Sequence, residues 1–199
     1  MYEVELKYRI DGKEVDILKA LNKKSEGKKE IYEDVYFTHS EILPLESSKE
    51  LRVRRISSDT KDRNILTYKS EIIEEESGSK NEFEVLVDNS DNTTNLLKAM
   101  GFKIEITFTK ECINWLLPKI LNNNNMLVSY VKIPEINDVF LEIEITINEN
   151  NEIENALKAI KDFTKQLKLN DNDIEKELYT DVVRNYRKRK MDSHTKGTH

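Results

Sequence analysis

The sequence contains very few of the residues that form disulfides or bind soft metal ions. Among its 199 residues there is one cysteine, Cys112, and there are three histidines, two of them within the last six positions. A single cysteine excludes an internal disulfide and is typical of a reducing compartment, so we expect a cytoplasmic protein. The shortage of histidine argues against a histidine-based zinc site.

Long apolar runs are absent as well. Charged residues make up 35% of the chain, and the mean hydropathy is -0.68. No apolar run approaches the roughly 18 residues that a membrane-spanning helix needs. Charges begin at Glu3, which leaves no apolar core for a signal peptide. The net charge of -6 makes nucleic acid an unfavourable partner. We therefore expect binding to neither membranes nor nucleic acid.

Apolar periodicity predicts a mixture of strands and helices. Alternating patterns predict strands at residues 2–10, 30–38, 49–57, 64–72, 81–88, 103–117, 126–133 and 139–148. Helical spacing and cap signals predict helices at residues 12–24, 90–101, 151–169 and about 172–190. No linker or internal repeat divides the chain, so residues 1–190 should form one α+β domain with an antiparallel barrel, followed by a disordered tail at 191–199.

Charged side chains recur at alternate positions within the predicted strands. Successive strand residues point to opposite faces, so residues two apart share a face. The sets that share a face are Glu3, Glu5, Lys7 and Arg9; Arg52 and Arg54; Thr67 and Lys69; Glu82 and Glu84; and Glu142 and Glu144. One such row is usually solvated. Five strands whose polar positions are almost all Glu, Arg and Lys, segregated by sign, instead favour a charged barrel interior.

A barrel closed with this face inward would hold acids on one side and bases on the other. Carboxylate oxygens are suited to Mg²⁺ or Mn²⁺. Arginine and lysine bind phosphate, arginine through its bidentate fork. Unneutralised, so many buried charges would be costly, so a metal-bound polyphosphate is the natural complement of this interior.

The charged motifs resemble, in order, those of one known family. They read EVELK at residues 3–7, then DVYF, LRVRR, LTYKS, the E-x-E of NEFEV, FLEIEI and a closing ELYTDVV. The ordered set is similar to that of the CYTH superfamily, the triphosphate tunnel metalloenzymes, over about residues 2–183. The sequence around the motifs looks most like that of members named class IV adenylyl cyclases.

This resemblance implies an eight-stranded antiparallel tunnel with helices packed outside, and Mg²⁺ or Mn²⁺ as cofactor. The implied metal ligands are Glu3, Glu5, Glu142 and Glu144. The implied substrate-binding residues are Lys7, Arg9, Arg52, Arg54, Lys69, Lys80, Glu84 and Lys110, and the implied catalytic residues are Lys7 and Glu5. A nucleoside triphosphate or inorganic polyphosphate would be the ligand, and a homodimer is compatible with the family.

The implied reaction is the conversion of ATP to cyclic AMP and pyrophosphate, with an inorganic or thiamine triphosphatase as alternative. Two positions depart from the family pattern. Cys112 stands at a position where family members often have an arginine. Lys132 is the residue nearest to a position where they often have an aspartate, and Asp138 follows six residues later. These departures keep a third alternative open, a catalytically weakened module that binds polyphosphate or nucleotide.

Overall fold

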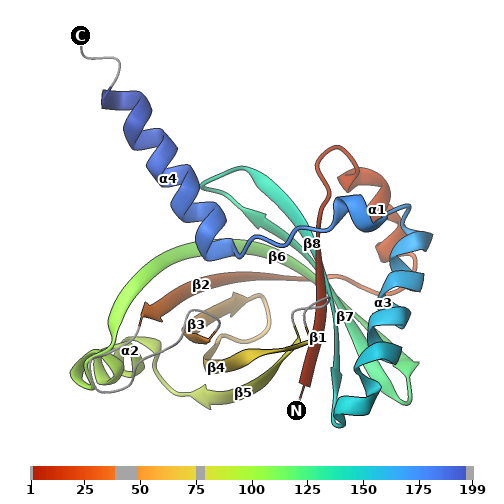
Figure 1. Cartoon of the computed structure of the whole chain (residues 1–199), viewed down its shortest axis with the longest axis horizontal. Coiled ribbons are helices and arrows are strands. Elements are labelled where there is room, and N and C mark those ends of the chain that lie inside the picture. Colours follow the sequence, from red (N-terminus) through yellow and green to blue (C-terminus); the bar gives the residue numbers. More distant parts are fainter. Residues whose placement is uncertain (1, 39–48, 75–78, 196–199) are drawn as a thin grey trace.

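Eight antiparallel strands close into a barrel, which confirms the predicted fold class (Figure 1). The computed structural model describes residues 2–38, 49–74 and 79–195. The strand order around the barrel is β1-β5-β4-β3-β2-β6-β7-β8. The strands are β1 (Tyr2–Arg9), β2 (Lys28–Thr38), β3 (Glu50–Ser58), β4 (Arg63–Glu74), β5 (Ser79–Val87), β6 (Lys103–Leu121), β7 (Asn124–Ile133) and β8 (Asp138–Ile147).

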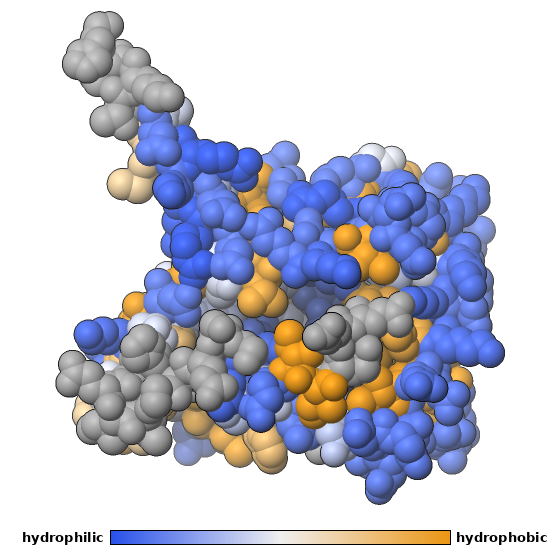
Figure 2. All heavy atoms as spheres, viewed as in Figure 1, coloured by the Kyte–Doolittle hydropathy of each residue, from blue (hydrophilic) through white to orange (hydrophobic). Residues whose placement is uncertain are grey.

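Three of the four helices cover the outside of the barrel. The helices are α1 (Glu14–Asn22), α2 (Ser90–Ala99), α3 (Ile153–Gln166) and α4 (Tyr179–Thr195). Helices α1 and α3 lie over the wall formed by β1 and β6 to β8, and α2 packs on β3 (Figure 1). The outward surface of the helices in this view is largely hydrophilic (Figure 2). No helix in the described ranges is long and apolar enough to cross a bilayer.

The larger apolar core lies between the barrel wall and the helices, and a second apolar cluster lies at the end of the barrel where α4 enters. On β8 the residues Leu141, Ile143 and Ile145 are fully buried and point outward against α3. The predicted apolar stripe of α3 packs against them, with Ile160 fully buried at its centre. Each such side chain contributes about 1.5–3 kcal/mol through burial. Because the outward positions form the core, the alternate positions of every strand are left to line the lumen.

The barrel closes through a short seam. Strand β1 pairs with β5 only at Tyr2–Asn81 and Glu3–Lys80, whereas it pairs with β8 along its whole length. Part of the free edge of β1 is taken by the segment that follows α3. Ile174 forms a bridge with Tyr8, and the Glu175 N–H donates to the Lys7 carbonyl at 2.8 Å. The seam therefore brings the C-terminal segment to one mouth of the barrel.

The C-terminal segment corrects two predictions. A helix was expected over about 172–190, but α4 begins only at Tyr179, because residues 174 and 175 are extended where they pair with β1. Disorder was expected from residue 191, but α4 continues to Thr195. No glycine or proline lies between Tyr179 and Thr195 to stop the helix. Residues 39–48 and 75–78, which the sequence leaves between predicted strands, lie outside the described residues.

Gly27 tests the packing between the start of β2 and the core. A Cβ at this position would lie 2.7 Å from atoms of Ile113 and Trp115, and Trp115 is fully buried. Gly27→Ala should therefore lower the free energy of unfolding by about 1–3 kcal/mol, the usual cost of overpacking. Urea denaturation measures this loss, with Ser25→Ala in the preceding turn as control. An equal, small effect of both changes would contradict the described packing.

Candidate active site

The charged rows of the strands face the lumen. On β1 the odd-numbered residues Glu3, Glu5 and Lys7 point inward, while Val4 and Leu6 are buried beneath the helices. Direct cross-strand partners share a face, so the pairing of Glu5 with Glu144 and of Lys7 with Glu142 places the E-x-E of β8 inside as well. The predicted inward orientation of the first and last strands is thus found in the fold.

Three carboxylates converge near one end of the lumen. Glu3 and Glu5 of β1 and Glu144 of β8 each have an oxygen atom within 4.8 Å of the others. Glu142, the fourth expected metal ligand, lies outside this group. It lies two residues away along β8, opposite Lys7, with Ile143 between it and Glu144. The acidic group at this end is therefore Glu3, Glu5 and Glu144.

The acidic group has more negative charge than its protein surroundings neutralise. Lys69 Nζ lies 2.5 Å from Glu3 and 3.6 Å from Glu82. Burial alone would raise the pKa of Glu3, but the Lys69 ammonium and hydrogen bonds hold it well below its usual range. Burial and the charge of Glu3 raise the pKa of Glu144 to about 8. Burial and the charges of Glu142 and Glu3 likewise raise the pKa of Glu5.

The chemistry of this group fits Mg²⁺ or Mn²⁺. Carboxylate oxygens are the hard ligands that both ions prefer. A divalent cation would supply the positive charge that Lys69 alone does not provide, and it would allow Glu5 and Glu144 to ionise at neutral pH. Glu3, Glu5 and Glu144 are the residues that would hold it.

A cluster of cationic side chains surrounds a buried aspartate on the opposite wall. Arg54 of β3 donates to Asp34 of β2 through Nε at 2.6 Å and through Nη2 at 2.8 Å. Lys110 of β6 lies 3.8 Å from the same carboxylate. Burial alone would raise the pKa of Asp34, but the Arg54 guanidinium holds it well below its usual range. We call Arg52, Arg54 and Lys110 the cationic cluster.

Arg52 has spare hydrogen-bonding capacity. Its terminal nitrogens lie 3.4 Å from the Tyr36 hydroxyl, 3.5 Å from Thr67 and 3.3 Å from Glu50. Its Nε is buried and has no hydrogen-bond partner among the described residues. A buried N–H without a partner is rare in folded proteins. A ligand with an oxygen acceptor near Arg52 would satisfy this donor.

The remaining predicted site residues are dispersed. Lys69 contacts the acidic group, and Lys80 is paired across the seam with Glu3. Glu84 accepts a hydrogen bond from Thr67 but is exposed. Arg9 lies apart from the cationic cluster, at the mouth beside α4. Its guanidinium is held by Asp138 at 2.6 Å and by Glu175 at 2.8 Å.

The two departures from the family pattern have different structural outcomes. Cys112 lies two residues after Lys110 and is buried in the lumen wall. Burial raises the pKa of its thiol to about 12, so no charge replaces the missing arginine. Lys132 lies on the outer face, opposite Glu111, because the lumen positions of β7 are Ser129 and Val131. Lys132 therefore does not enter the acidic end of the lumen as its register suggested.

A hollow adjoins the acidic group at the end of the lumen away from α4. It has a volume of about 280 Å³ and is lined by Leu116, Asn125, Leu127, Glu144 and Thr146. Its leucines give it an apolar wall, unlike the charged centre of the lumen. The volume is close to the lower end of the range for small-molecule pockets. An organic group could therefore occupy the hollow while a charged group contacts Glu144.

The comparisons with known proteins agree with this arrangement. The CYTH domain family matches residues 1–179. A closed eight-stranded barrel with acids and bases inside is the architecture that the sequence motifs implied. The chain therefore belongs to the CYTH family.

Its relatives include several archaeal proteins. A Methanocaldococcus jannaschii protein named "Putative adenylate cyclase MJ0240" is 28% identical over 184 residues, which are 92% of this chain and 98% of the relative. A solved Pyrococcus horikoshii protein has a TM-score of 0.79 at 25% identity and covers 92% of this chain and 99% of its own. A conserved hypothetical protein of Pyrococcus furiosus has a TM-score of 0.67 at 31% identity, over 89% and 98% of the two chains.

Asp34 was missed in the sequence, although it lies in the DVYF motif, and it gives a direct test of the cationic cluster. Asp34→Asn leaves the buried Arg54 guanidinium without its counter-charge, so the free energy of unfolding should fall by about 3–5 kcal/mol. Urea denaturation measures the change. The neighbouring Glu33 points outward to an exposed pair with Arg55 at 3.7 Å, and Glu33→Gln should change the free energy by less than about 1 kcal/mol. Similar losses in both variants would refute the role of Asp34.

The raised pKa of Glu144 predicts how stability depends on pH. Between about 5 and 8 the folded state keeps a proton that the unfolded state releases, so raising the pH in this range should lower the melting temperature of the metal-free protein. Mg²⁺ or Mn²⁺ should restore stability more at pH 8 than at pH 5, since protons compete with the cation at low pH. Differential scanning fluorimetry measures both trends.

Glu144→Gln is the control for this experiment. It removes one titrating carboxylate, so both the pH dependence and the stabilisation by the cation should become weaker. A melting temperature that is flat over this pH range in the unmodified protein, or equal stabilisation by the cation at both pH values, would contradict the proposed acidic group.

Proposed function

We propose that the chain is a metal-dependent enzyme that acts on a triphosphate held inside the barrel. One observation carries the proposal: the acidic group and the cationic cluster lie on different walls of one closed lumen. A phosphate chain needs cationic side chains along its oxygens and a cation chelated by carboxylates beside the reacting phosphorus. Inorganic sulfate or a simple carboxylate would use only the first of these features.

The cationic and acidic side chains of the lumen have different roles. The cationic cluster and Lys69 bind phosphate oxygens and stabilise the negative charge that shifts during transfer. Glu3, Glu5 and Glu144 would hold Mg²⁺ or Mn²⁺, and the ion would supply positive charge to the phosphates. Lys7 lies between the acids and the cationic cluster and binds a phosphate oxygen. Burial lowers the pKa of Lys7 while Glu142 and Glu5 oppose this shift, and as an ammonium Lys7 would hold that oxygen by charge and by hydrogen bonding.

Cyclisation of a nucleoside triphosphate is the first candidate reaction. In it the ribose 3′ hydroxyl attacks the α-phosphorus and pyrophosphate leaves. The hollow beside Glu144 supports a substrate with an organic group, because its walls include Leu116 and Leu127. The name of the Methanocaldococcus jannaschii relative agrees with this reaction.

Hydrolysis of a triphosphate is the second candidate. In it water attacks the terminal phosphorus and orthophosphate leaves. The observation that favours it is the set of ion pairs across the lumen, because their charged side chains bind phosphates whatever organic group the substrate carries. Both reactions use the same metal and phosphate ligands, and they differ in the nucleophile and in the phosphorus attacked.

Product analysis separates the candidates. The protein is incubated with ATP or with tripolyphosphate in the presence of Mn²⁺, and the products are resolved by ion-exchange chromatography. Cyclic AMP with pyrophosphate supports the cyclase, and orthophosphate from tripolyphosphate supports the hydrolase. Tight tripolyphosphate binding without any product identifies a binding module. The proposal is overturned if the protein neither binds nor converts ATP and tripolyphosphate.

Two substitutions test the separate roles of the acidic group and the cationic cluster. Glu5→Gln and Arg52→Gln should each lower the rate with the active substrate by about 10²–10³, because the first removes a carboxylate that would hold the metal and the second a charge at the phosphates. Glu111→Gln on the outer face is the matched control and should keep the full rate. Steady-state kinetics at saturating Mn²⁺ measures the effect. Rates within a few-fold of wild type in Glu5→Gln and Arg52→Gln would show that the lumen is not the reaction site.

A further inference from the structure

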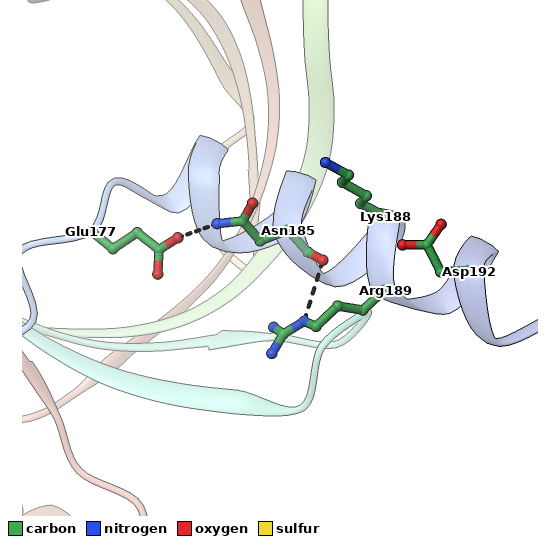
Figure 3. Close-up of a pocket in the computed structure, with 5 residues that line it drawn as sticks. All are labelled: Glu177, Asn185, Lys188, Arg189 and Asp192. Carbon is green, nitrogen blue, oxygen red and sulfur yellow. Dashed lines mark hydrogen bonds between the residues drawn. The ribbon is translucent and has the colours of Figure 1, made fainter.

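The entry into α4 is fixed by contacts on both sides. The Glu177 carbonyl accepts a hydrogen bond from Lys7 Nζ, and the Glu177 carboxylate accepts one from Asn185 at 2.6 Å (Figure 3). Two residues earlier, Glu175 is bound to β1 through its backbone N–H and through Arg9. These contacts hold the chain in one path as it reaches Tyr179, the first residue of α4.

Tyr179 enters the lumen from this position. Its side chain is almost fully buried, and its ring packs edge-on against Phe140 with 5.1 Å between the centroids. The Lys110 ammonium lies 3.9 Å from the centroid of the Tyr179 ring, and the Lys7 ammonium lies 4.3 Å from it. A ring face attracts ammonium groups at such distances. Tyr179 therefore holds together two lysines that would repel each other.

The hydroxyl of Tyr179 is buried and makes no hydrogen bond of good geometry among the described residues, and burial together with the nearby Glu142 carboxylate raises its pKa. Buried polar atoms in folded proteins nearly always have a partner, and leaving one without is unfavourable. A phenolic hydroxyl is protonated at neutral pH and can donate. Since α4 begins here, the positive end of its helix dipole lies at the same place. Each of these features suits an anionic acceptor beside Lys7 and Lys110.

We propose that Tyr179 contacts the substrate, donating its hydroxyl hydrogen bond to a phosphate oxygen that Lys7 and Lys110 also bind. The inference rests on the proposed function and adds a neutral donor, supplied by the C-terminal helix, to a site otherwise built from charged side chains of the barrel. The ring positions the two lysines in the free protein, and the hydroxyl gains its partner when the ligand binds.

The test uses the full chain and separates the hydroxyl from the ring. Tyr179→Phe removes only the hydroxyl, and Tyr179→Leu removes the ring as well. Tyr186→Phe is the matched control, because Tyr186 lies on the same helix and is only partly buried. Isothermal titration with tripolyphosphate, with and without Mg²⁺, gives the affinity of each variant. Thermal melting without ligand gives its stability.

The proposal predicts opposite changes in affinity and stability. Tyr179→Phe should bind tripolyphosphate about tenfold more weakly, the usual effect of losing one hydrogen bond to a charged group. Its melting temperature without ligand should equal or exceed that of wild type, because an unsatisfied buried hydroxyl has been removed. Tyr179→Leu should bind more weakly still, since Lys7 and Lys110 lose the ring that orients them. Tyr186→Phe should match wild type.

Two results would overturn the inference while the proposed function stands. One is wild-type affinity in Tyr179→Phe. The other is a parallel loss of affinity and melting temperature in that variant, which would make the hydroxyl a structural group. If the wild-type protein binds neither tripolyphosphate nor ATP, the proposed function fails and this inference fails with it. If Tyr179→Leu does not fold, the affinity and melting temperature of Tyr179→Phe still test whether the hydroxyl contacts the ligand.

Discussion

The structure depends on neutralising charges that the barrel places out of bulk water. Closing the sheet with its charged face inward puts Glu3, Asp34 and Arg54 where an unpaired charge is expensive. Asp34 and Arg54 neutralise each other, and Lys69 neutralises Glu3. Glu5 and Glu144 remain beside Glu3, and burial raises the pKa of both. Ionising both beside Glu3 would need the positive charge that a metal ion supplies, so this acidic group is also the candidate metal site.

The location of the hydrophobic core makes this charged interior possible. The wall formed by β1 and β8 buries Leu6, Ile143 and their neighbours outward, under α1 and α3. The barrel is thus held mainly from outside, and its lumen is packed by apolar side chains only at the end where α4 enters, as far as the described residues show. This division leaves the lumen free to carry side chains chosen for a ligand. Helix α4 differs from the other helices because its first residue, Tyr179, enters the lumen instead of covering it.

The sequence was most informative where strand alternation decides the answer. The i, i+2 spacing of Glu3, Glu5 and Lys7 was enough to place them on one face, and the paired E-x-E of β8 followed by the same rule. Asp34 could not be found in this way, because its partner Arg54 is set by the register between β2 and β3. Tyr179 depends on the pairing of residues 174 and 175 with β1, which no local pattern reveals.

The central claim is that one lumen holds a cation and a phosphate chain together. Anomalous diffraction from crystals grown with Mn²⁺ and tripolyphosphate tests it most directly. The account predicts a manganese peak coordinated by Glu3, Glu5 and Glu144, with phosphate density running from it toward Arg52, Arg54 and Lys110. Manganese and phosphate found only on the outer surface, with the lumen filled by water, would contradict it.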